Sequence, residues 1–96
     1  MDTTTLLNVI HRAIIAAGLS RDADCGANAL PDGYVSGGAN DGERYVIAQH
    51  DPFKDTFDGV PYVRVAAWGE GIGVNRAVVP WDATAGDIER AFRALI

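Results

Sequence analysis

The segment VPYVRVAAWGEGIGVNRAVV, residues 60–79, decides the fold, because it predicts two valine-rich strands joined by a tight, glycine-rich turn. Two connections are possible, and they place different side chains on each face. A loop at Gly69–Gly71 would set Arg64 directly opposite Arg76, which brings like charges together. A two-residue turn at Glu70–Gly71 avoids this contact, and glycine in its second position suits a type I′ turn. We therefore expect the two-residue turn.

That register gives the hairpin one apolar face and one mixed face. The apolar face carries Val63, Val65, Ala67, Ile72, Val74 and Val78, with Arg76 as its only charged member. The mixed face carries Tyr62, Arg64, Ala66, Trp68, Gly73, Asn75, Ala77 and Val79. In this arrangement Trp68 lies across from Gly73 and covers its bare backbone.

An amphipathic helix is predicted at each end of the chain. Over residues 3–17 the apolar positions recur at helical spacing, with Asp2 and the three threonines at 3–5 as sources of a cap oxygen and Gly18 as a stop after them. They are Leu6, Leu7, Ile10, Ala13, Ile14 and Ala17. Over residues 85–95 Ile88, Ala91, Phe92 and Leu95 repeat this pattern. Thr84 and Asp87 precede them with the spacing of a capping box.

Between these segments the chain alternates loops and one further strand. Residues 20–43 are dense in Gly, Asn, Asp and Pro, which predicts a long loop, and Tyr34–Ser36 is a candidate for a short edge strand within it. A hairpin through Gly37–Gly42 would then lead to a strand at Arg44–His50. The prediction is a single α+β domain, residues 1–96, of order α-β-β-β-α. It has a fourth strand if Tyr34–Ser36 pairs, and both helices pack on one face of an antiparallel sheet.

The net charge of −5 falls entirely within residues 21–60, which hold eight acidic side chains against three basic ones. An acidic surface repels phosphate backbones and attracts basic surfaces. No run of apolar residues is long enough to span a membrane, and no basic segment precedes the first apolar stretch as in a secretory signal. We therefore expect a cytoplasmic protein, in its own cell or in the host of a phage, that binds neither nucleic acid nor membrane.

No set of residues has the spacing of a catalytic or metal site. Cys25 is the only cysteine, and nothing in the sequence brings it near His50 and Asp51 as a nucleophile, base and orienting group. His11 falls at the rim of the first helix's apolar face. Two acidic loops lack the alternating ligands of a calcium loop; they contain Asp51, Asp55 and Asp58, and Asn40, Asp41 and Glu43. We expect no enzyme activity, no metal and no cofactor.

The element order is shared by double-stranded RNA-binding domains, but those proteins bind phosphates with basic side chains, whereas here the final helix opens with Thr84-Ala85-Gly86-Asp87 and contains no lysine. The favoured function is a non-catalytic, acidic protein-binding module that acts as a monomer or homodimer on a basic partner surface. An inhibitor carried by a phage or mobile element, of the anti-CRISPR or nucleic-acid-mimic kind, fits this size and charge. The expected partner-binding residues are Asp22, Asp24, Asp41, Glu43, Asp51, Asp55, Asp58, Tyr62, Arg64 and Trp68.

Two alternatives stay open at this point. One is an immunity protein or a small secretion chaperone, both of which are also small and acidic. The other is a small enzyme that uses residues 20–43 as a lid over its site.

Overall fold

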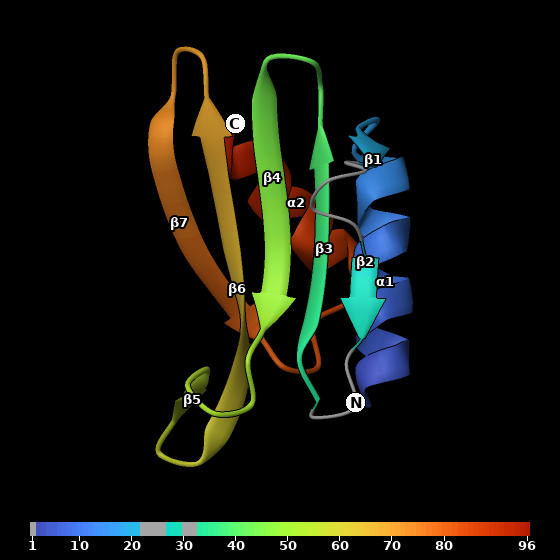
Figure 1. Ribbon diagram of the computed structural model, residues 1–96, viewed down its shortest axis with the longest axis vertical. Helices are drawn as coiled ribbons and strands as arrows, with labels where there is room; N and C mark the ends of the chain where they lie inside the picture. Colours follow the sequence, from blue (N-terminus) through green and yellow to red (C-terminus); the bar gives the residue numbers. More distant parts are fainter. Residues whose placement is uncertain (1, 22–26, 30–32) are drawn as a thin grey trace.

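A computed structural model describes residues 2–21, 27–29 and 33–96. The elements are α1 (Thr3–Ala16), β1 (Ser20–Arg21), β2 (Ala27–Ala29), β3 (Val35–Asn40), β4 (Arg44–His50), β5 (Thr56–Phe57), β6 (Val60–Gly69), β7 (Gly73–Pro80) and α2 (Ala85–Leu95). Every strand pair is antiparallel, and both helices lie behind the same face of the sheet (Figure 1). The predicted α+β class with terminal helices is confirmed.

Both helices begin and end through local contacts that the sequence specifies. Asp2 caps α1 by accepting a hydrogen bond of 2.7 Å from the backbone N–H of Thr5. Gly18, with φ of 72°, takes the left-handed conformation just after α1 ends. Thr84 and Asp87 form the predicted capping box at the start of α2, each side chain accepting from the other residue's backbone N–H.

The sheet runs in the order β7, β6, β4, β3, and β1 and β2 both pair with the outer edge of β3. The prediction of a short edge strand at Tyr34–Ser36 is wrong, because β3 continues through Gly37 and Gly38 to Asn40. Both glycines are buried inside the sheet, and the turn follows at Asp41–Glu43. Gly37 shares the helix-facing side with Val35 and Ala39, so the small side chains of β3 let α1 pack closely against this strand.

The core lies between the sheet and the two helices. Its largest fully buried side chains come from the helices, with Leu6 and Ile10 on α1 and Ile88 and Phe92 on α2. Alternate residues of the central strands complete it: Val46, Ala48, Val63, Val65 and Ala67. No helix among residues 2–21, 27–29 and 33–96 is both long and apolar enough to cross a membrane.

The register between β6 and β7 differs from the prediction. Gly69 pairs with Gly73, which leaves residues 70–72 as a three-residue connection in place of a two-residue turn at Glu70–Gly71. A shift of one residue moves every side chain of β7 to the opposite face. Val63 and Val65 therefore share the helix side with Val79 and Ala77. The predicted apolar hairpin face, with Val74 and Val78 in the core, is wrong.

Two features account for this register: the backbone conformation of the glycines and the environment that each polar side chain of β7 receives. Gly69, Gly71 and Gly73 have φ values of 135°, 82° and 64°, which side chains rarely adopt, so the three glycines permit a connection that other residues would strain. The register also keeps the Arg76 guanidinium out of the core, where an unpaired charge is costly. Asn75 faces the helices instead, and its side-chain amide donates a hydrogen bond of 2.8 Å to the last carbonyl of α2.

Candidate protein-interaction surface

The face of the sheet that points away from the helices, which we call the open face, is covered by neither α1 nor α2 (Figure 1). On β4, β6 and β7 it carries Tyr45, Ile47, Gln49, Tyr62, Arg64, Ala66, Trp68, Val74, Arg76 and Val78. All of these side chains except Tyr45 and Tyr62 line a groove of about 630 Å³ between β4 and β7. Val74 and Val78 are 62% and 64% exposed, which is unusual for valines in a strand.

An aromatic pair occupies one end of this face. Tyr45 and Trp68 are directly opposite across β4 and β6, and their rings stack with centroids 5.7 Å apart and planes 13° from parallel. Stacked cross-strand aromatic pairs stabilise a sheet and present a rigid apolar surface. Trp68 lies across from Val74 on β7, not from Gly73 as predicted, so an apolar strip crosses all three strands.

Arg64, at the middle of the open face, is paired with Asp55 from the loop below it. Its Nε lies 2.7 Å from Asp55 Oδ1. This distance is short enough for an ion pair, although the angle at the N–H group is not that of a hydrogen bond. Asp55 is 2% exposed, and its other oxygen accepts the backbone N–H of Asp51 at 2.7 Å. Asp55 therefore holds the loop and Arg64 in place. The expectation that it contributes a free carboxylate to an acidic surface is wrong.

The remaining predicted acidic residues separate into two groups. Asp41 and Glu43 lie in the turn between β3 and β4, beside Glu70, whose backbone N–H donates to the Glu43 carbonyl. Asp51 and Asp58 lie at the opposite end of the strands. Since β4 separates the groups, they are roughly 20 Å apart. Among the described residues the acidic side chains thus border both ends of the sheet; the predicted Asp22 and Asp24 lie outside the described residues.

Asp41 is the most constrained of these carboxylates. It accepts the backbone N–H groups of Arg44 and Glu43, at 2.7 and 3.0 Å, and pairs with the Arg44 guanidinium at 3.0 Å. The backbone donor of Arg44, followed by that of Glu43, lowers the pKa of Asp41 below its ordinary value of 3.8. Asp41, Glu43 and Glu70 are all exposed, but the hydrogen bonds of the turn hold the carboxylate of Asp41 in place.

The histidines have structural surroundings. His50 is 3% exposed, its Nδ1 lies 2.7 Å from the carbonyl oxygen of Tyr62, and its ring packs 4.3 Å from the centroid of Trp81. His11 is partly buried on α1. Cys25 lies outside the described residues. Within the described part of the chain, no three His, Cys, Asp or Glu side chains gather as metal ligands do.

Comparison of the chain with protein-family models, with curated proteins and with solved structures found no match. The chain's own surfaces therefore provide the evidence for its function.

Sequence reasoning found Tyr62, Arg64 and Trp68 on the open face but missed Val74, Arg76 and Val78. The signal that could have placed them was the run of alternate glycines at 69, 71 and 73, which indicates a longer connection. The polar pair Asn75–Arg76 was a second signal. Only one of these two side chains can face the helices, and only Asn75 is short and neutral enough to be satisfied there.

Proposed function

We propose that this chain is a non-catalytic protein-binding module whose contact surface is the open face of the sheet. The observation that carries the proposal is the apolar strip of this face, continued along β7 to Val78: Val74 and Val78 are exposed, Trp68 is half-buried, and the exposed Arg76 lies between the two valines. Aromatic side chains and arginine are enriched at the centres of protein interfaces, and exposed apolar patches mark interaction sites.

The acidic residues complete this surface as a rim. Glu43 and Glu70 border the strip at one end, and Asp51, Asp58 and Asp82 border it at the other. An interface commonly has an apolar centre and a charged rim, and the rim sets the rate and specificity of association. The partner that fits is a protein with an apolar patch surrounded by basic side chains.

A partner of this kind is found among proteins that hold nucleic acid on a basic surface. We therefore favour an inhibitor that occludes such a surface, as phage and mobile-element accessory proteins of the anti-CRISPR or nucleic-acid-mimic kind do. The net charge of −5 supports this form of the proposal, because it opposes direct binding of nucleic acid to the chain itself.

The test is a pull-down from lysate of the source cell and of a phage host, with three tagged proteins compared side by side. The variant Val74→Ser/Val78→Ser removes the apolar strip at two exposed positions, so folding should be retained. The control Ile15→Ser makes the same kind of change at a side chain that is 76% exposed on α1. Circular dichroism confirms that all three proteins are folded.

We expect the same protein partner with the wild type and with Ile15→Ser, and its loss with Val74→Ser/Val78→Ser. Higher salt should weaken recovery, because the rim is charged. Equal recovery with all three proteins would show that the open face is not the contact surface. Recovery of nucleic acid without protein would contradict the proposal that the chain is a protein-binding module.

A further inference from the structure

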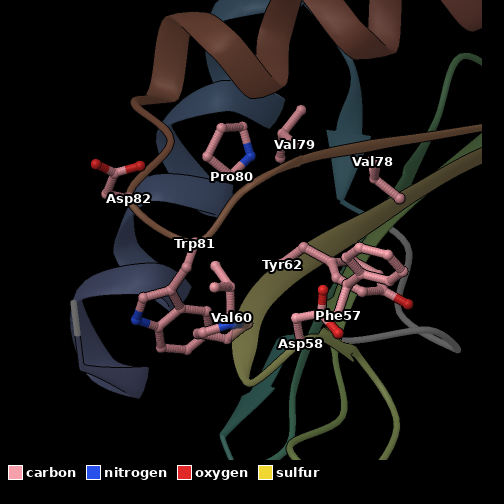
Figure 2. Close-up of a pocket in the computed structure, with 10 residues that line it drawn as sticks. Phe57, Asp58, Val60, Tyr62, Val78, Val79, Pro80, Trp81 and Asp82 are labelled. Atoms are coloured by element: carbon pink, nitrogen blue, oxygen red, sulfur yellow. The ribbon is translucent and has the colours of Figure 1, made fainter.

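A second concavity lies at the end of the sheet where β5, β6, the end of β7 and the connection to α2 meet (Figure 2). Its volume is about 890 Å³. Three aromatic side chains line it, Phe57, Tyr62 and Trp81, together with Val60, Val78, Val79, Pro61 and Pro80. Among the described residues, Asp58 and Asp82 are its only carboxylates and no basic side chain lines it. We call it the aromatic pocket.

The local sequence builds one wall of this pocket with a tight turn. Phe57 pairs with Val60, which leaves Asp58–Gly59 as a two-residue hairpin turn. Their φ values of 51° and 78° are those of a type I′ turn, for which Asp-Gly is a preferred pair. The turn leaves Phe57 and Val60 at 76% and 65% exposure instead of packing them in the core.

The opposite wall is formed by Trp81, which packs against a buried residue of the sheet. Pro80 ends β7, and the chain then turns so that Trp81 lies against the buried ring of His50 at 4.3 Å. The His50 ring is itself positioned by the carbonyl of Tyr62, 2.7 Å from its Nδ1. In the view of Figure 2, Trp81 and Asp82 lie on one side of the pocket and Phe57 and Asp58 lie on the other. An indole held in this way is available as a fixed stacking surface.

Both charged side chains that line the pocket among the described residues are negative. Neither Asp58 nor Asp82 forms an ion pair with any basic side chain in the described part of the chain. Both are exposed at the rim, beside aromatic rings that attract cations through their faces. The carboxylates and the rings therefore favour the same kind of occupant, a cation with an apolar stem.

We infer that the aromatic pocket receives an arginine side chain supplied by the partner protein. The planar guanidinium stacks on an aromatic face and donates to carboxylates at the same time, which a lysine ammonium does less well. The valines and prolines of the pocket cover the aliphatic stem of the arginine. This inference rests on the proposed function, because it names the chemistry of one contact between the module and a basic partner surface.

The test uses the isolated protein and two short peptides, acetyl-Gly-Arg-Gly-amide and the same peptide with neutral citrulline in place of arginine. Titrations are followed by two-dimensional NMR of the tryptophan indole N–H groups. Trp81 reports the aromatic pocket, and Trp68 on the open face is an internal control. We expect the arginine peptide to shift Trp81 and not Trp68, with an affinity about tenfold above that of the citrulline peptide.

Two matched charge variants test which carboxylates bind the guanidinium of the arginine peptide. Asp58→Asn/Asp82→Asn removes two charges from the pocket, and asparagine tolerates the positive φ at position 58, so the turn is retained. Glu43→Gln/Glu70→Gln removes two charges at the other end of the sheet. The preference for arginine over citrulline should disappear in the first variant and persist in the second.

Each outcome decides the inference separately from the proposed function. Equal shifts with both peptides, no shift of Trp81, or equal loss in both charge variants would overturn the arginine pocket. The pull-down is repeated with Val74→Ser alone, because Val74 lines the groove of the open face and not the pocket, whereas Val78 lines both; its outcome therefore tests the proposed function separately. Conversely, a selective Trp81 shift supports the pocket even if the Val74→Ser/Val78→Ser variant retains the partner.

Discussion

Replacing Gly69 with alanine tests the three-residue connection between β6 and β7 at the residue where it is most constrained. A Cβ at this position would lie 2.5 Å from the Glu43 carbonyl oxygen and 2.8 Å from Arg44 Cα, both of them backbone atoms that have little freedom to move. The φ of 135° adds strain of about 1–3 kcal/mol for a residue with a side chain. Overpacking against fixed atoms adds about 1–3 kcal/mol more.

We therefore expect Gly69→Ala to lower the free energy of unfolding by about 4 kcal/mol, a large part of the roughly 5–14 kcal/mol typical of a chain of this length. Urea denaturation followed by circular dichroism measures this loss. Gly71→Ala is the control, because its φ of 82° is also left-handed but nothing lies within 4 Å of its Cβ. That variant should lose only about 1–2 kcal/mol. Equal losses in the two variants would refute the register described here.

Three further predictions concern the pairs and the core. Asp55→Asn should cost about 2 kcal/mol in unfolding free energy, because it leaves the partly buried Arg64 without its counter-charge; an unchanged urea midpoint would contradict this. Phe92→Ala should cost about 3–5 kcal/mol, and a loss below 1 kcal/mol would place Phe92 outside the core. Backbone N–H donors lower the folded-state pKa of Asp41 and Asp87 below 3.8, so their stabilisation is complete well above pH 3.8 and lost as the pH falls through the folded pKa. NMR titration of both carboxyl groups checks this; midpoints at or above 3.8 would refute it.

The parts of the fold that the sequence predicted correctly are those with strong local signals. Asp2 and Gly18 mark the ends of α1, and Thr84 with Asp87 marks the start of α2, because capping depends on side chains within a few residues of the helix end. The strand at Arg44–His50 was also predicted with its observed bounds, since its first half is β-branched and aromatic.

The wrong predictions concern glycines, because glycine occurs both in turns and inside strands. Gly37 and Gly38 suggested a turn, yet they are buried inside β3, where they pair with Ala48 and Ile47 of β4. Gly69, Gly71 and Gly73 permit a three-residue connection that the pattern of valines alone did not indicate. Local propensity cannot distinguish these cases, because tertiary packing decides them.

The candidate surface was predicted only in part, because some of its features are local to one strand and others depend on tertiary contacts. Trp68 and Tyr62 were placed on the correct face, since alternation along one strand is a local property. The burial of Asp55 depends on Arg64, nine residues away on β6, and an acidic residue in a loop is ordinarily exposed. The aromatic pocket required the position of Trp81 relative to Phe57, which only the folded chain provides.

The role of the open face is measured most directly by the dissociation constant of the purified partner for three proteins: the wild type, Val74→Ser/Val78→Ser and Ile15→Ser. If the open face is the contact surface, isothermal titration calorimetry will show affinity at least about tenfold weaker for Val74→Ser/Val78→Ser. The Ile15→Ser protein will bind as the wild type does. The same affinity for all three proteins, or a loss confined to Ile15→Ser, would contradict the account.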